Sequence, residues 1–148
     1  MNPEALVAPH AIEYTYTRST GPVIGAFLTA LRDRRILGVR ARDGRVLVPP
    51  AEYDPVTSED ISELVEVGDA GVVTTWVWNP NPLAGQPLDR PFAWALVRLD
   101  GADTGMLAAV DVEGPAAIRT GLRVRVRWAE HRVGSIRDLL CFQPEDSA

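Results

Sequence analysis

The chain has 148 residues and a formal net charge of −5, from 15 basic and 20 acidic residues. Every basic residue is an arginine, which excludes Schiff-base catalysis by a lysine of this chain and the lysine-containing phosphate loop of nucleotide hydrolases. One cysteine excludes an internal disulfide and a cysteine-based zinc site, and two histidines are too few for a histidine-rich metal site. The hydrophobic share of 46% is enough for one folded domain with a core.

The excess of acidic over basic residues also limits the kinds of partner that the chain can bind. Non-specific nucleic-acid binding needs a basic face, and no apolar run approaches the roughly 18–20 residues that span a bilayer. The first ten residues lack the basic start and apolar block of a signal peptide. We therefore expect a cytoplasmic protein without a nucleic-acid or membrane partner.

The chain begins with an expected extended arm over residues 1–19, in which Ile12–Thr17 favours a short strand. A helix follows within residues 20–35. Thr20 is the predicted cap, Pro22 suits the first turn, and the helix should end near Arg34. Its apolar side chains recur at helical spacing: Val23, Ile24, Phe27, Leu28 and Leu31.

Residues 36–63 contain a predicted β-hairpin. Two alternating runs flank Asp43-Gly44, a dipeptide typical of tight hairpin turns. Pro49 and Pro50 stop the second run, and a loop leads on to residue 63.

From residue 64 to residue 148 the pattern is that of strands. Predicted strands cover residues 64–67, 71–78, 92–99, 106–112, 122–128 and 136–142, with a proline-rich loop over 79–87. Apart from the short run 64–67, the five longer strands at this spacing predict a small closed barrel of the OB type. The fold class is therefore mainly β: a five-stranded OB-fold barrel preceded by an N-terminal helix and a hairpin.

Two patterns in the barrel have a functional and a structural interpretation. Arg123, Arg125 and Arg127 share one face of a strand and could bind phosphates, although alternation alone favours a solvated outer face. Trp76 and Trp78 share a face and could stack bases, but the acidic charge favours core or interface packing. We find no serine elbow, dinucleotide loop or acid–base pair, so the domain is predicted to be non-enzymatic.

The run from Arg40 to Thr57 resembles a known family, the zinc-ribbon and OB-fold acyl-CoA-associated proteins once named domain of unknown function thirty-five. Gly44, Pro49, Pro50 and Pro55 stand where that family has its glycine and prolines, and residues 65–68, 71–76, 91–97 and 121–126 are also similar. The four positions of the family's zinc cysteines hold Arg40, Asp43, Asp54 and Thr57. Because an arginine repels a metal cation, the resemblance implies a degenerate ribbon without zinc or another prosthetic group. A pair of Arg40 with Asp43 or Asp54 is a plausible replacement.

The resemblance also implies a function. Such proteins accompany thiolase-like enzymes, and this sequence is most similar to the actinobacterial branch beside steroid side-chain aldolases. We expect a non-catalytic accessory subunit that stabilises a thiolase-like partner of the sterol-carrier-protein type, in an assembly of two copies of each chain. The partner would cleave a carbon–carbon bond in a steroid acyl-CoA, and the complex would be a lyase or a thiolase.

Several residues are candidates for binding acyl-CoA or for contacting the partner. Candidates for binding the CoA phosphates are Arg40, Arg42 and Arg45 near the hairpin and then Arg123, Arg125 and Arg127. Candidates for the partner interface are Tyr14, Tyr16, Phe27, Leu31, Pro49, Pro50, Tyr53, Trp76 and Trp78. Two alternatives stay open: a single-stranded nucleic-acid binder of the OB class and a free-standing acyl-CoA binding protein.

Overall fold

The structure, a computed structural model, describes residues 5–146, so residues 1–4 of the predicted arm and 147–148 of the predicted barrel domain lie outside it. Helix α1, Pro22–Arg32, buries Val23, Phe27 and Leu31 on one face. The predicted cap at Thr20 is wrong. The N-cap is Gly21, and the Glu52 carboxylate accepts the backbone N–H groups of Val23 and Ile24 at 3.0 and 2.9 Å. Gly21 has a φ of +80°, which favours glycine.

The predicted hairpin is present and belongs to a three-stranded antiparallel sheet. Strands β1 (Ile36–Arg40), β2 (Val46–Leu47) and β3 (Leu64–Val67) have the order β2-β1-β3. Gly44 lies in the turn with a φ of +91°. We call this sheet, together with the loop between β2 and β3, the ribbon. Strand β3 thus pairs with β1 and is not part of the barrel.

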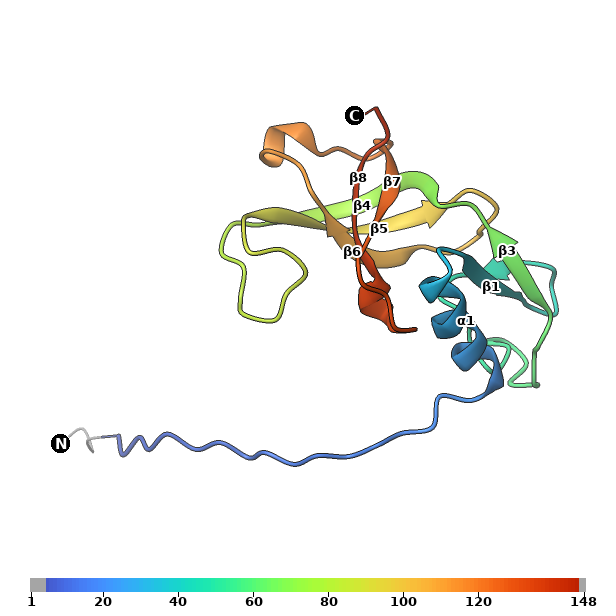
Figure 1. Ribbon diagram of the computed structural model, residues 1–148, viewed down its shortest axis with the longest axis horizontal. Helices are drawn as coiled ribbons and strands as arrows, with labels where there is room; N and C mark the ends of the chain where they lie inside the picture. Colours follow the sequence, from blue (N-terminus) through green and yellow to red (C-terminus); the bar gives the residue numbers. More distant parts are fainter. Residues whose placement is uncertain (1–4, 147–148) are drawn as a thin grey trace.

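The remaining strands form the predicted five-stranded OB barrel, which the topology confirms. They are β4 (Ala70–Asn79), β5 (Phe92–Leu99), β6 (Met106–Val110), β7 (Arg123–Trp128) and β8 (Leu139–Pro144). The closed order is β4-β5-β6-β8-β7, antiparallel except for β6 and β8, which are parallel. Figure 1 shows the barrel with α1 and the ribbon packed at one end.

Two short 3₁₀ helices lie between barrel strands, and one of them takes the place of predicted strand residues. η1 (Pro115–Ala117) lies between β6 and β7, and β6 ends two residues before the predicted Val112. η2 (Ile136–Asp138) occupies the predicted start of the last strand. The reason is a capping box, in which Ser135 and Asp138 bond each other's backbone and hold the chain in a helical turn.

The helix, ribbon and barrel share one apolar core. On β5, Ala93, Ala95, Val97 and Leu99 point inward and are buried, as the alternation predicts. Phe27 and Leu31 of α1 belong to the same buried cluster as these barrel residues. A smaller cluster forms between Phe92, Ala109, Cys141 and Leu88.

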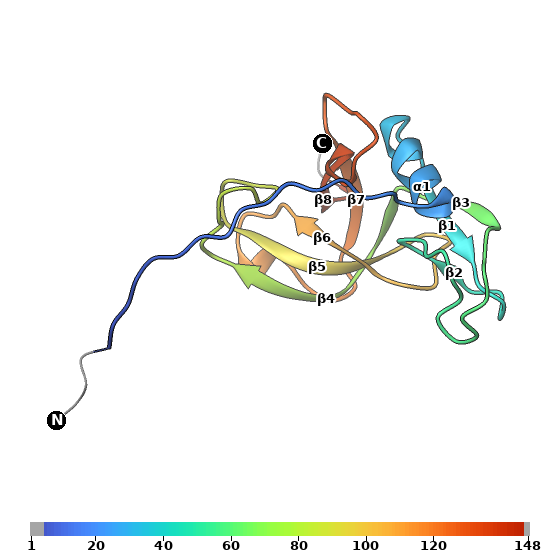
Figure 2. The same cartoon turned by 90° about the horizontal axis from the view of Figure 1, so that it is seen from below.

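The arm, residues 5–20, is extended and exposed, and the strand predicted over Ile12–Thr17 is not formed. No backbone hydrogen bond involves these sixteen residues, so nothing in the described chain pairs with them. Figures 1 and 2 show the arm leaving α1 and running away from the body of the protein. Within residues 5–146 no helix has the length and apolarity needed to cross a membrane.

Candidate functional site

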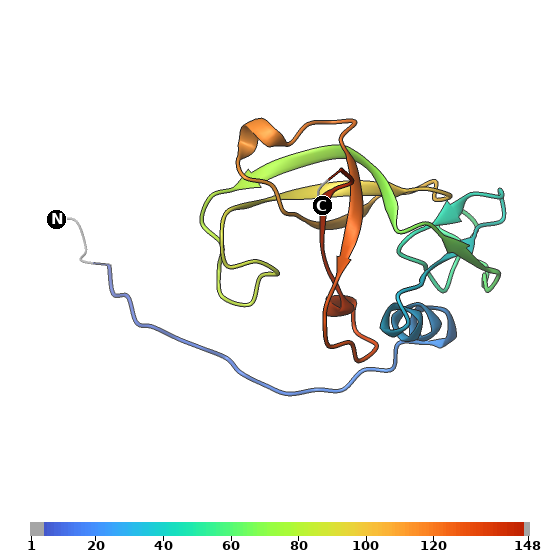
Figure 3. The ribbon, with the colours of Figure 1, turned by 45° about the horizontal axis from the view of Figure 1, so that its top comes forward.

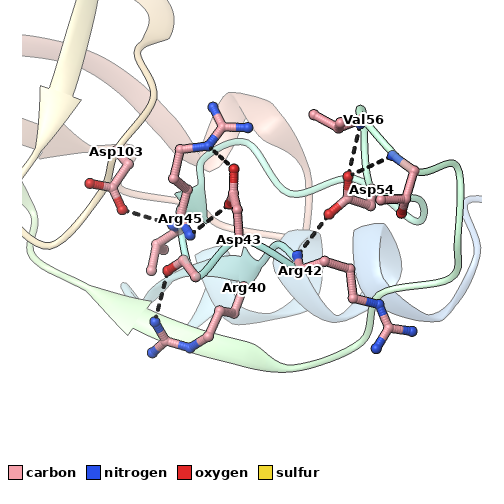
Figure 4. A network of polar contacts seen from close by, with 10 residues as sticks. Arg40, Arg42, Asp43, Arg45, Asp54, Val56 and Asp103 are labelled. Carbon is pink, nitrogen blue, oxygen red and sulfur yellow. Dashed lines mark hydrogen bonds and ion pairs between the residues drawn. The ribbon is translucent and has the colours of Figure 1, made fainter.

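The centre of the ribbon is the carboxylate of Asp54, which is 3% exposed. One oxygen accepts the backbone N–H of Arg42 at 2.7 Å, and the other accepts those of Val56 and Thr57 at 2.8 and 3.0 Å. These donors, Arg42 first, lower the pKa of Asp54 below its ordinary value. Figure 4 shows that the carboxylate lies between the hairpin turn and the loop after it. Asp54 therefore ties together the two loops that carry the family's zinc-ligand positions.

The expected ion pair of Arg40 with Asp43 or Asp54 is wrong. Arg40 bonds Glu63 at 3.0 Å and the Gly44 carbonyl at 3.1 Å, while Asp43 pairs with Arg45 at 2.7 Å. The residues at the four positions do not fit a zinc ion, because the Asp54 oxygens are already taken by N–H groups and Arg40 is a cation. In the described part of the chain no group of three or more His, Cys, Asp or Glu residues could hold a metal.

Two side chains from the β5–β6 loop tie the ribbon to the barrel. The Asp103 carboxylate accepts the Val46 N–H at 2.8 Å. The Thr104 hydroxyl accepts the Val48 N–H at 2.8 Å and donates to the Val48 carbonyl at 3.0 Å. Val48 is 1% exposed, so these bonds satisfy backbone groups that water does not reach.

The first group of CoA candidates surrounds a shallow hollow of about 340 Å³ in the ribbon, lined by Arg40, Arg42 and Gly44 on one side and by residues 60–63 on the other. Arg42 pairs with Glu59 at 3.2 Å, and Arg45 points to Asp43 instead. All three arginines are therefore already paired with carboxylates. A phosphate here would have to displace exposed ion pairs, which water and salt screen.

The second group of CoA candidates consists of Arg123, Arg125 and Arg127, which differ in whether a carboxylate pairs with them. Arg123 bonds Asp100 at 2.7 Å and Glu145 at 3.0 Å, and these carboxylates raise its pKa. Arg127 bonds Asp111 at 2.6 Å and the Cys141 Sγ at 3.0 Å. Burial would raise the pKa of Asp111, but hydrogen bonds from Arg127 and Arg90 lower it. Arg125 is exposed and has no side-chain partner within residues 5–146.

The interface candidates fall into three groups. Phe27 and Leu31 are 3% and 0% exposed, and Pro50 is also buried, so these three predictions are wrong: the residues pack in the chain's own interior. Trp76 and Trp78 are half-buried and pack against the barrel core, as the core-packing interpretation predicts. The exposed candidates are Tyr14, Tyr16, Pro49 and Tyr53.

A hollow with mainly apolar walls was not predicted from the sequence. It has a volume of about 370 Å³ and lies between β6 and the start of β8. We call it the β6–β8 groove; its walls are Gly85–Pro87 of the β4–β5 loop, Trp94, Met106–Ala109, Ile136–Arg137 and Leu139–Leu140. OB folds bind ligands on the face of their second and third strands and on the adjoining loops, which here are β5, β6 and residues 80–91 and 129–138.

Comparisons with known proteins agree with this architecture. Residues 64–129 match the family model described as the ChsH2 C-terminal OB-fold domain. A DUF35-family protein of unknown function from Sulfolobus solfataricus is similar in structure, with 24% identity and a TM-score of 0.57 over 72% of this chain and 78% of that chain. A chain of the Ltp2-ChsH2(DUF35) aldolase is similar with 23% identity and a TM-score of 0.60, over 86% of this chain and 98% of that chain.

A search of curated proteins finds no significant match. The sequence match and the barrel topology together confirm the resemblance inferred from the sequence. Residues 64–129, from β3 to the end of β7, are thus similar to the ChsH2 C-terminal OB-fold domain, and β8 completes the barrel.

Proposed function

We propose that the chain is a non-catalytic accessory subunit of an aldolase complex. The observation that carries this proposal is the match of the barrel to the ChsH2 family, supported by a likeness that spans 98% of a chain of the Ltp2-ChsH2(DUF35) aldolase. The partner would be a thiolase-like protein of the sterol-carrier-protein type, with two copies of each chain. Its substrate would be a steroid side-chain acyl-CoA, and the partner would perform the carbon–carbon cleavage.

The polar groups of this chain support a non-catalytic role. Asp54 and Asp138 are buried, but each bonds three backbone N–H groups and is not aimed at an open site. Burial raises the pKa of the Cys141 thiol, so it is a poor nucleophile. These groups organise the backbone, and catalysis would fall to the partner.

Exposed apolar side chains supply a surface for the partner. Tyr53 and Val56 on the ribbon loop are 60% and 76% exposed, and Val77 on β4 is 60% exposed. Stable interfaces bury at least about 1,000 Å² and concentrate aromatic and apolar residues at their centre. The ribbon loop, with Pro49 next to it, is the proposed first contact.

We also propose that this chain contacts the CoA part of the substrate. Arg125 is the candidate that needs no ion pair broken, while the three ribbon arginines would exchange carboxylates for phosphates. An Arg125→Ala variant should then weaken acyl-CoA binding by the complex, and an Arg98→Ala variant serves as the exposed control.

The experiment is co-expression with a thiolase-like protein of the sterol-carrier-protein type from the same organism. We expect the two to co-purify, and a Tyr53→Asp/Val56→Asp variant to lose the partner while keeping its own melting temperature. Val133→Asp, at an equally exposed valine on another loop, is the matched control. A thiolase-like protein that is soluble and fully active without this chain would overturn the proposal.

A further inference from the structure

The β6–β8 groove is a gap in the barrel wall with two open strand edges. Strand β6 pairs with β5 from Met106 to Val110, but with β8 only through Val110 and Phe142. Strand β8 pairs with β7 from Leu139 onward. Met106–Ala109 and Leu139–Leu140 therefore face each other across the groove without a ladder between them. Open edges above an apolar floor are the template for an added strand.

Apolar side chains that line the groove are exposed to solvent, and an added strand would cover them. Leu107 is 63% exposed and Ile136 is 51% exposed, and both line the groove together with Trp94 and Pro87. Apolar side chains gathered in a hollow, rather than scattered singly, indicate a binding surface.

The arm has the complementary features. Ile12, Tyr14 and Tyr16 alternate with Glu13, Thr15 and Thr17, so an extended backbone places the three apolar side chains on one face. They are 76–77% exposed, and the two tyrosine rings lie 5.9 Å apart. Nearly all of these residue types favour strands, yet the segment has no strand partner in the described chain.

In the structure this segment does not occupy the chain's own groove, and no backbone hydrogen bond ties it to β6 within the described residues. Figures 1 and 3 show the arm continuing past the barrel instead of folding onto it.

A second copy of the chain offers an arm for this groove and a groove for this arm. If the two copies exchange arms, both contacts form. Three apolar side chains of this size bury roughly 400–500 Å² per arm, and the groove loses a similar area. Two symmetric arms would then bury about 1,800 Å², which lies in the range of stable interfaces.

We propose that the chain forms a symmetric dimer by exchange of arms, in which the segment Ile12–Thr17 of each copy adds a strand to β6 in the β6–β8 groove of the other. Tyr14 and Tyr16 pack on the groove walls, and the backbone of the segment bonds the open edge of β6. This interaction joins two copies of this chain and does not depend on the aldolase partner.

The test uses cysteine cross-linking of the full chain, since the native Cys141 is fully buried. A Tyr14→Cys variant is mixed with a Leu107→Cys variant and mildly oxidised. We expect a covalent dimer in which mass spectrometry of the joined peptides shows position 14 linked to position 107, and this species disappears on reduction. A mixture of Tyr14→Cys with Leu64→Cys is the matched control, because Leu64 is exposed on the ribbon, away from the groove.

Sedimentation provides the second measurement. The unmodified protein should be a dimer at about 100 µM, and Leu107→Arg should make it a monomer that keeps the circular dichroism spectrum of the folded chain. A monomeric unmodified protein would overturn the proposal. So would a cross-link that forms only within one chain, in a Tyr14→Cys/Leu107→Cys double variant, because the occupant would then be the chain's own arm.

Discussion

The Asp54 carboxylate accepts the backbone N–H of Arg42 at 2.7 Å, and this bond joins the hairpin turn to the loop that follows β2. The same carboxylate accepts two further N–H groups from its own loop. In the family that the sequence resembles, zinc-binding cysteines stand at the positions of Arg40, Asp43, Asp54 and Thr57. Here a side chain performs the same cross-linking with hydrogen bonds.

Replacing Asp54 by asparagine should destabilise the protein. An amide has one acceptor oxygen where the carboxylate has two, so its NH₂ group would face a backbone N–H and leave it unpaired. We expect the melting temperature at pH 7 to fall by about 5–10 °C. The exposed Asp89, changed to asparagine, is the control and should have no effect.

The difference between Asp54→Asn and the unmodified protein should depend on pH. Because the folded-state pKa of Asp54 lies below its ordinary value, the stability it contributes is complete above the unfolded pKa, about 4. That stability is lost as pH falls through the lower, folded pKa. The two melting temperatures should therefore converge as pH falls below about 4 and the folded protein becomes protonated at Asp54. A gap that does not narrow at all in acid would contradict the role of the ionised carboxylate.

Thr104→Val should loosen the ribbon from the barrel. The substitution keeps the shape of the side chain but leaves the N–H and carbonyl of the buried Val48 without their partner, at a cost of about 1–3 kcal/mol. Hydrogen exchange at residues 46–48 should accelerate. Thr120→Val is the control, since that hydroxyl is exposed and makes only a 3.4 Å bond. Equal exchange in both variants would contradict the prediction.

Glu52→Ala should destabilise α1, because two N–H groups of its first turn lose their acceptor. Loss of such a cap costs about 1 kcal/mol, and urea denaturation can measure it. Glu52→Gln keeps an acceptor oxygen and should recover most of the loss, while the exposed Glu113→Ala should be neutral. A Glu52→Ala variant as stable as the unmodified protein would show that the cap is dispensable.

Zinc should play no part in the stability of the ribbon. Elemental analysis of the purified protein should find no stoichiometric zinc, and treatment with a chelator should leave the melting temperature unchanged. One zinc per chain, with a melting temperature that falls on chelation, would contradict both the sequence inference and the Asp54 geometry.

The strands were predictable where side-chain alternation decides them. The predicted bounds of β5, residues 92–99, are the observed ones, since alanines and valines alternate inward along the whole strand. The start of β8 was not predictable by alternation, because the Ser135–Asp138 capping box stabilises a 3₁₀ turn there. A capping pattern is local, so a search for it could have found η2.

The binding surfaces depend on contacts between distant residues, which a single sequence does not reveal. The β6–β8 groove exists because two strands pair at one position only, and strand lengths do not predict that. Part of the role of Asp54 can be predicted locally, since Asp-Pro-Val-Thr is typical of an aspartate that caps its own loop. No local pattern in the sequence predicts its bond to the Arg42 N–H. Glu52 likewise reaches α1 across 28 residues.

The shared core has a consequence for how the protein unfolds. Phe27 and Leu31 from the helix and Val46 and Val48 from the ribbon lie in one buried cluster with residues of the barrel, such as Val97. No part can open without exposing apolar surface of the others, so the chain should melt in one cooperative transition. A partner that touches only the ribbon loop would then protect the whole chain, and its binding energy would appear as protection of barrel amides far from the contact.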